Sequence, residues 1–475
     1  VSDTRRTSVH QAMGKALSRL GEHAQALHHF EEALRVTAED HDRFDILQEI
    51  IALKITGGHY EEAVQLCQSQ REFALHHANK ELLASVETNL GRAEFLRGNF
   101  QESRQSFSAA LEIYRSTQNK QKTVNALMNL GNVLSATHDF RGALEQWTQA
   151  LALSEELGTQ HQAAQIQNNI GIAHYKLREF EESRLCYEKA KQIFEDLNSK
   201  SGLALTLTNL GEVAYAEGDY ERALEYWSEA LKLFRVMKDA GGITETLLQL
   251  AQVWNIFGDF HQMQPLLDQA EGLVLEYRLS AFRGHLSYLR GMLSFASKKY
   301  YEALNAFLSA RDSFHLESEH ERFYLAVLRA AETQASLGQN KEAVCTLQGT
   351  QADGQLKAFP LVMAEFCHLL GTIARMYPEV VGEKPLVYFK QGLELVRNEL
   401  VAEISWKLPY AMGKEYARRG QRDKAKENFL SAKMIIEHFA SRITSPELRQ
   451  KYLSVDGRGE ILSEISTYLQ QKTGG

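Results

Sequence analysis

Five side-chain amides recur with a spacing of 40 residues along the middle of the chain. They are Asn89, Asn129, Asn169, Asn209 and Gln249. A primary amide carries two N–H donors and a carbonyl acceptor, so it can bond both polar groups of an extended peptide backbone, whatever the side chains of that peptide are. The same amides could instead bond a neighbouring helix. This amide column therefore favours recognition of a main chain, with a structural role as the alternative.

The sequence lacks the residue patterns of common catalytic sites. It contains no GxxxxGK[ST] phosphate loop, GxGxxG fingerprint, GxSxG elbow or HExxH motif. The densest histidines, His23, His28 and His29, have no carboxylate or cysteine at the spacing of metal ligands, and the cysteines form no CxxC pair. We therefore predict that the chain is not an enzyme and that it holds neither a metal nor a cofactor.

The composition argues against two classes of partner. Of 475 residues, 61 are Asp or Glu and 53 are Lys or Arg, which gives a net charge of -8 and removes the general attraction to phosphate backbones. No apolar run approaches the roughly 20 residues of a membrane-spanning helix, and the N-terminus has no signal-peptide core. Widely separated cysteines fit a reducing compartment. We expect a cytoplasmic protein that binds neither nucleic acid nor a membrane.

The amide column belongs to a longer repeat with a period of 40 residues. A small residue lies two positions after each amide, and an aromatic residue lies nine positions after that small residue. A large ring and an alanine follow the aromatic residue at helical spacing. In one unit these are Gly131, Phe140, Trp147 and Ala150. The glycine lets a second helix cross close to the first, and the ring fills the space beside the crossing. The spacing predicts helical hairpins that stack, because no hairpin can bury its apolar face alone.

This pattern resembles the tetratricopeptide repeat. The resemblance is carried most clearly by Leu210-Gly211, Gly218-Asp219-Tyr220, Ala223, Trp227 and Ala230-Leu231. The unit is about six residues longer than the usual 34, and it resembles the subtype of kinesin light chains and of spindle adaptors named for a Leu-Gly-Asn repeat, which Leu130-Gly131-Asn132 spells out. The resemblance implies an all-α, right-handed superhelical solenoid of about eleven hairpins. It also implies that the first helix of each hairpin lines a concave, protein-binding face.

Residues beside the amide column should set specificity on such a face. Arg92 and Asn132 lie one turn after the column, Asn125 lies one turn before it, and Lys176 lies further along its helix. The surface is polar but carries few cations. The resemblance implies that this set binds a protein or an extended peptide. A chaperone C-terminal tail is not expected, because its relatives bind it with several basic residues beside the asparagines.

The organisation along the chain is expected to follow the regularity of the repeat. We expect N-terminal hairpins in 1–80, regular 40-residue units in 81–240, divergent units in 241–400, a final hairpin in 401–442 and a capping segment in 443–475. In the last part Ser445 is a helix N-cap that precedes Pro446, so a terminal helix should cover the last exposed apolar face. The segment 442–453 is also similar to the closing segment of repeat arrays in large bacterial regulators, which would make the chain a sensor arm.

The repeat and the amide column favour a non-enzymatic scaffold or sensor module that recognises a protein or peptide on its concave surface. Two alternatives stay open. The array could be a self-associating assembly arm, which a stable oligomer without a partner would indicate. It could also be the regulatory part of a longer signalling ATPase or kinase, which the full-length gene would reveal.

Overall fold

The computed structural model describes residues 2–37, 40–317, 319–352, 354–396 and 403–470. Over these ranges the chain is all-α, and consecutive helices pair into eleven antiparallel hairpins, as the spacing predicted. The chain divides into two compact units, residues 1–198 (unit 1) and 199–475 (unit 2), and each is described by itself. This boundary falls inside the segment 81–240.

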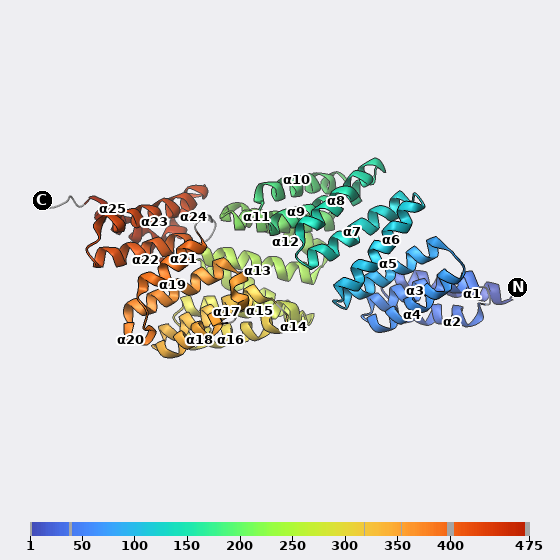
Figure 1. Cartoon of the computed structure of the whole chain (residues 1–475), viewed down its shortest axis with the longest axis horizontal. Coiled ribbons are helices and arrows are strands. Elements are labelled where there is room, and N and C mark those ends of the chain that lie inside the picture. The colour runs from blue at the N-terminus through green and yellow to red at the C-terminus, as the bar shows by residue number, and fades with distance from the viewer. Residues whose placement is uncertain (1, 38–39, 318, 353, 397–402, 471–475) are drawn as a thin grey trace. The chain divides into compact units, whose positions relative to one another are not determined.

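Unit 1 consists of five hairpins that follow one another in chain order (Figure 1). Their helices are α1 (Ser2–Arg19), α2 (His23–Val36), α3 (Asp40–Thr56), α4 (Tyr60–His76), α5 (Lys80–Leu96), α6 (Phe100–Ser116), α7 (Lys120–Ala136), α8 (Phe140–Glu156), α9 (Gln160–Lys176) and α10 (Phe180–Asp196). Each helix contacts its neighbours in the chain, and α5 also contacts the first helices α3 and α7. The first helices therefore form one layer of the unit and the second helices another.

Unit 2 consists of six hairpins and a C-terminal segment. Its helices are α11 (Lys200–Ala216), α12 (Tyr220–Met237), α13 (Ala240–Ile256), α14 (Phe260–Glu276), η1 (Ser280–Phe282), α15 (Arg283–Ala296), α16 (Tyr300–Leu316), α17 (His320–Ser336), α18 (Asn340–Ala352), η2 (Gly354–Ala358), α19 (Pro360–Met376), α20 (Pro378–Val381), α21 (Pro385–Leu395), α22 (Ile404–Arg418), α23 (Arg422–Arg442), α24 (Pro446–Ser454), η3 (Val455–Gly457) and α25 (Arg458–Gln470). The hairpin of α19 and α21 is the least regular, because the short α20 interrupts it.

The turns inside the hairpins explain where the helices begin and end. Gly98 and His138 have φ angles of 83° and 62°, in the left-handed region that reverses the chain after a first helix. The next residue then caps the second helix in several units. Asp139 Oδ1, for example, accepts a hydrogen bond of 2.9 Å from the backbone N–H of Gly142. Local residues thus define each hairpin.

The glycine column lies at the helix crossing, which confirms the prediction from the repeat. A Cβ atom on Gly171 would lie 2.6 Å from Tyr187 Cε1, and one on Gly91 would lie 2.9 Å from the Phe107 ring. The close approach also lets Ser183 Oγ on the second helix donate a hydrogen bond of 2.8 Å to the carbonyl oxygen of Gly171. The ring of one helix therefore rests directly on the backbone of the other.

Where the crossing residue is larger, its partner is smaller. Ala251 shares a core cluster with Leu267, in the positions that Gly211 and Trp227 occupy one unit earlier. Ala331 is matched in the same way with Leu347, and Ile51 is matched with Cys67. The total volume at the crossing is thus kept roughly constant along the array, as close packing requires.

The C-terminal segment performs two different tasks within unit 2. Its last helix, α25, packs on the final hairpin, where the rings of Tyr468 and Phe429 lie 4.9 Å apart. Its first helix, α24, is capped by Ser445 and lies against the first two hairpins of the unit. The backbone N–H of Thr444 donates to Glu221 Oε2 over 2.7 Å, and Lys451 Nζ lies 2.9 Å from Asp259 Oδ2. The segment therefore connects the end of unit 2 to its beginning.

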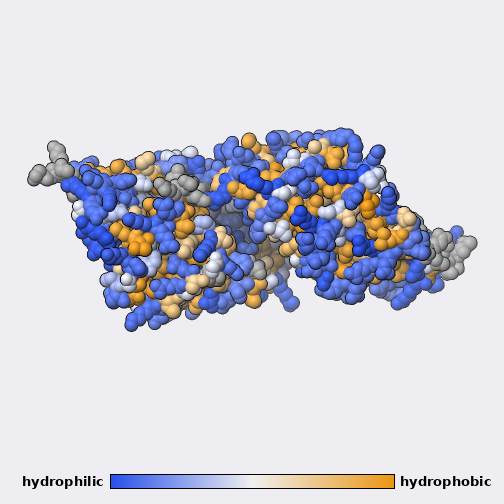
Figure 2. Space-filling view, in the orientation of Figure 1, coloured by the Kyte–Doolittle hydropathy of each residue, from blue (hydrophilic) through white to orange (hydrophobic). Residues whose placement is uncertain are grey.

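The face in Figure 2 is predominantly hydrophilic, with apolar residues in separate groups among charged ones. Among the described helices, none is both long and apolar enough to cross a bilayer.

Candidate functional site

The amide column lies on the first helices of the hairpins. Asn89, Asn129 and Asn169 lie on α5, α7 and α9 of unit 1, whereas Asn209 and Gln249 lie on α11 and α13 of unit 2. The asparagines are half-buried and Gln249 is buried. A step of two residues rotates a helix by about 200°, so each amide points away from the helix crossing at the glycine two residues later.

Several of these amides bond the neighbouring first helix. Asn89 Nδ2 donates to Gln48 Oε1 over 2.7 Å, and Asn169 Nδ2 lies 3.5 Å from Asn132 Oδ1. In unit 2, Gln249 Nε2 lies 3.4 Å from Glu212 Oε1. One bond does not exhaust the two donors and one acceptor of an amide. The geometry is thus compatible with both roles that the sequence left open.

Two neighbouring pockets lie beside the column in unit 1. The apolar pocket has a volume of about 180 Å³ and is lined by Arg92, Phe95, Leu96, Phe107, Asn129 and Asn132. The polar pocket has the same volume and is lined by Ser85, Thr88, Asn89, Arg92, Tyr114, Lys122, Asn125 and Ala126. The exposed Arg92 side chain lines both pockets, so the two form one continuous surface over α5 and α7.

The structure brings together five of the predicted site residues in these pockets: Asn89, Arg92, Asn125, Asn129 and Asn132. Among the described residues, the Asn129 amide has no hydrogen-bond partner. Lys176 lines neither pocket, and its ammonium lies 5.7 Å from the centroid of the adjacent Tyr175 ring. Asn169 reaches this surface only through its contact with Asn132.

The polar residues of this surface that sequence reasoning missed include Lys122 and Tyr114. Lys122 lies seven residues before Asn129, two helical turns away on the same face of α7. Following this face one turn beyond the predicted Asn125 would have found it. Tyr114 comes from the second helix α6, and its hydroxyl lies 3.3 Å from Thr88 Oγ1. Its position in the packing stripe of α6 gave no sign that its hydroxyl lines a pocket.

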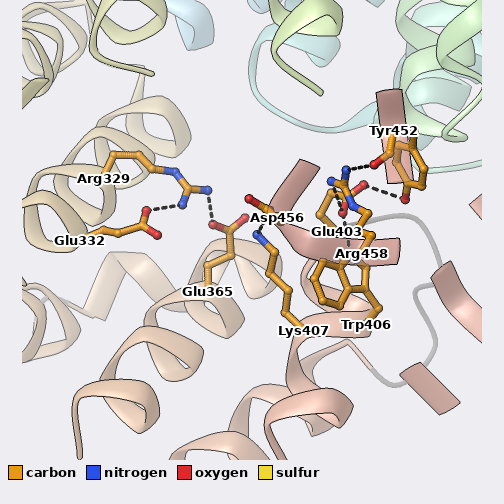
Figure 3. Close-up of polar contacts among 9 residues, drawn as sticks. All are labelled: Arg329, Glu332, Glu365, Glu403, Trp406, Lys407, Tyr452, Asp456 and Arg458. Carbon is orange, nitrogen blue, oxygen red and sulfur yellow. Dashed lines mark hydrogen bonds and ion pairs between the residues drawn. The ribbon is translucent and has the colours of Figure 1, made fainter. Parts of the chain in front are cut away.

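In the later hairpins of unit 2, several of the same positions of the repeat carry charged residues. Arg329 occupies the position of the amide column, Glu332 that of Asn132, and Glu365 and Lys407 that of Asn125. Arg329 Nη1 donates to Glu332 Oε2 over 2.7 Å, and its Nη2 donates to Glu365 Oε2 over 2.6 Å (Figure 3). The inner face of unit 2 is therefore an ionic network.

The C-terminal segment adds a second part to this network. Asp456 Oδ2 lies 2.9 Å from Lys407 Nζ, and Arg458 Nη2 lies 3.0 Å from Glu403 Oε2 (Figure 3). Arg458 is only 2% exposed, and its guanidinium carbon lies 4.2 Å from the centroid of the Tyr452 ring. Burial raises the pKa of the Tyr452 hydroxyl well above its usual range, so this side chain stays neutral.

Two histidines on this inner face predict a pH dependence. Burial lowers the pKa of both His285 and His368 to about 3, so the folded protein keeps them neutral. The unfolded chain takes up these protons near the ordinary histidine pKa of about 6.5, so stability is full above that pH and falls as the pH decreases. The upper limit is about 1.4 kcal/mol per pH unit for each histidine. We expect urea unfolding of unit 2 to show this loss between about pH 6.5 and pH 5, before carboxylates contribute. His368→Gln should reduce the slope, and an unchanged slope would contradict the assignment.

The geometry defines an array of helical hairpins whose first helices carry polar, pocket-lined surfaces. Models of the tetratricopeptide repeat match residues 81–156, 122–196 and 204–235. The chain is a tetratricopeptide-repeat protein, a fold that typically serves as a non-catalytic scaffold for protein interaction. A model of anaphase-promoting complex subunit 5 also matches residues 7–55 and 287–352. No curated protein sequence matches the chain.

Solved structures share this fold. The apo form of RapI is 13% identical, and the match covers 70% of this chain and 99% of that chain with a TM-score of 0.52. A signal transduction ATPase with a tetratricopeptide repeat sensor from Pyrococcus horikoshii is 15% identical, with 57% of this chain and 43% of that chain covered and a TM-score of 0.50. Kinesin light chain repeats from Podosopora anserina are 17% identical over 41% of this chain and 96% of that chain, with a TM-score of 0.37.

Among the described residues, no group of three or more His, Cys, Asp or Glu side chains could hold a metal ion. Two of the cysteines, Cys67 and Cys367, are buried. Burial raises the pKa of Cys67 and of Cys367 to about 12, which keeps both protonated.

Proposed function

We propose that unit 1 is a protein-binding module that holds an extended segment of a partner across α5, α7 and α9. The observation that carries this proposal is the continuous surface of the apolar and polar pockets, with the unpartnered Asn129 amide on it. An extended chain passing over Asn129 would find a donor and an acceptor for its main chain. Phe95 and Phe107 would contact an apolar side chain of the same segment.

The cations of the polar pocket favour one sign of charge in the bound segment. Arg92 and Lys122 both line it, and no carboxylate does. A segment with an acidic side chain at this position therefore complements the pocket better than a basic one. The chain as a whole would act as the scaffold or sensor part of a regulator, a role compatible with the array sensors among proteins of this fold.

The test removes two amides together. If Asn129 and Asn169 bond the partner's main chain, each contributes about 1 to 2 kcal/mol, and the double change Asn129→Ala with Asn169→Ala weakens binding roughly 30- to 1000-fold. A peptide selected on the wild-type chain from a random phage-displayed library serves as the probe, and its affinity is measured by isothermal titration calorimetry.

The matched control is Gln101→Ala with Gln105→Ala, which removes two exposed amides from α6 in the same unit. This control should leave the affinity within about twofold, because neither residue lines the pockets. A lower melting temperature with unchanged affinity per folded molecule for the asparagine double variant would instead show that the amides support the array. A peptide that bound both variants like the wild type would place the binding surface elsewhere.

A further inference from the structure

A separate pocket in unit 2 gathers positive charge between two first helices and the C-terminal segment. It has a volume of about 270 Å³ and is called the cation pocket here. It is lined by His368, Thr372 and Arg375 of α19, by Trp406, Lys407, Tyr410, Ala411 and Lys414 of α22, and by Asp456 and Ile461 of the C-terminal segment. Its lining contains three cations and a single carboxylate.

Two of these cations are already paired with carboxylates of the C-terminal segment. Lys407 Nζ lies 2.9 Å from Asp456 Oδ2. Lys414 Nζ lies 3.2 Å from Glu464 Oε1, and the Tyr410 hydroxyl donates to the other oxygen of Glu464 over 2.6 Å. The pocket thus recognises two carboxylates of its own chain, with an ammonium for each and a phenol hydroxyl for one of them.

The third cation is not compensated. Arg375 lies in the last turn of α19, half-buried, and within the described part of the chain it makes no hydrogen bond or ion pair. Arg375 lines the pocket, and its positive charge helps to lower the pKa of His368, for which burial and Lys407 are the larger causes. The planar N–H donors of the Arg375 guanidinium can therefore bind a further carboxylate, in a pocket that already binds two.

We infer that the cation pocket binds an acidic segment of a partner protein, in competition with Asp456 and Glu464 of the C-terminal segment. An incoming carboxylate pairs with Arg375 and then shares Lys414 and Tyr410 with Glu464, which is about half exposed and free to turn outward. The pocket is small for a ligand site, so it accepts one or two side chains and no folded domain.

The C-terminal segment stays attached during this exchange. Lys451 pairs with Asp259 and Thr444 bonds Glu221, both away from the cation pocket. Glu464 therefore acts as an internal competitor that lowers the affinity for acidic partners without holding the fold. This inference rests on unit 2 alone, and the amide surface of unit 1 is not part of it.

The test measures binding of a fluorescein-labelled oligoglutamate peptide to the full chain at low salt by fluorescence anisotropy. Arg375→Gln should weaken binding by about tenfold or more, as expected for a charge-assisted, two-pronged contact. Glu464→Gln should strengthen binding by about threefold to tenfold, because the internal competitor loses its charge. The matched control Lys390→Gln removes an exposed cation from α21 and should change the affinity by less than about twofold.

Two further arms separate this site from others. On an Arg92→Gln background, which weakens the polar pocket of unit 1, Arg375→Gln should still cause the same loss of oligoglutamate binding, and an oligoglutamine peptide should not bind. Equal losses for Arg375→Gln and Lys390→Gln, weaker binding after Glu464→Gln, or no binding to the wild type would overturn the inference. Displacement of the peptide by inorganic phosphate as readily as by free glutarate would also overturn it, since it would indicate general anion binding. Circular dichroism establishes that each variant is folded.

Discussion

Replacing Gly171 with leucine is expected to lower the free energy of unfolding of unit 1 by about 3 kcal/mol. The Tyr187 ring covers this glycine, and its Cε1 atom lies 2.6 Å from where a Cβ would be. Tyr187 is only 2% exposed, so the ring has no space into which it can retreat. The helices would have to separate, which also lengthens the hydrogen bond from Ser183 to the Gly171 carbonyl. Urea unfolding followed by circular dichroism measures the loss.

The matched control is Gly272→Leu. Gly272 also lies within a helix, α14, but nothing lies within 4 Å of a Cβ built there. Leucine has a higher helix propensity than glycine, so this change should be neutral or stabilising by up to about 1 kcal/mol. If both leucines had the same effect, the helix crossing would not be the cause.

The array itself supplies a second control. Gly171→Ala combined with Tyr187→Leu recreates the pair that Ala251 and Leu267 form in unit 2. The double variant should lose less stability than the sum of the two single changes, because the smaller partner makes room for the added methyl group. Additive losses would contradict pairwise volume matching at the crossing.

Much of the fold could be predicted because each hairpin is defined by residues close together in sequence. The glycine at one position and the ring 16 residues later locate the crossing, and residues such as Asp139 locate the start of the second helix. A unit without a glycine at the crossing also follows this rule, since Ala251 packs with Leu267 in the positions that Gly211 and Trp227 occupy one unit earlier. A nearest-neighbour array needs no information from distant residues.

What could not be predicted depends on contacts between distant residues. Thr444 and Glu221 are 223 positions apart, and no local pattern links them. Gly218 shows the difficulty well. It belongs to the repeat pattern, and its φ of 77° is that of a turn residue, but a Cβ there would also lie 2.6 Å from Phe439 Cε1. The turn signal gave no sign that the end of the unit packs against this glycine.

The candidate site was predictable in part for a related reason. The 40-residue phase decides where a side chain lies, whereas its residue type decides only what it can bind. The prediction followed the amides and therefore ended at Gln249. Following the phase alone would have continued to Arg329, Glu332 and Glu365, which belong to the ionic network of unit 2, whereas Lys407 lies two positions beyond the phase. The peptide-binding role of the asparagines stays a prediction.

The C-terminal segment of unit 2 depends on one buried cation, Arg458. It is 2% exposed, pairs with Glu403 over 3.0 Å and donates from Nη1 to the Tyr452 carbonyl oxygen over 2.7 Å. Removing one member of such a buried pair leaves the other charge unpaired, which typically costs about 3 to 5 kcal/mol. We therefore expect Arg458→Ala to destabilise unit 2 by this amount. Hydrogen exchange should show the loss first in α24 and in the turn at Glu221, because the segment detaches before the hairpins separate.

Two variants decide whether the unpaired charge causes this loss. Arg311→Ala removes a partly exposed arginine paired with the exposed Asp312 over 2.7 Å and should cost less than about 1 kcal/mol, since surface ion pairs contribute little. Arg458→Met combined with Glu403→Gln should recover part of the loss, because the methionine fills some of the volume and no carboxylate is left without its cation. Equal effects of the Arg458 and Arg311 changes, or no recovery in the double variant, would show that the segment is held mainly by Tyr452 and its apolar neighbours. In that case Arg458 would have little part in joining the end of unit 2 to its first hairpins.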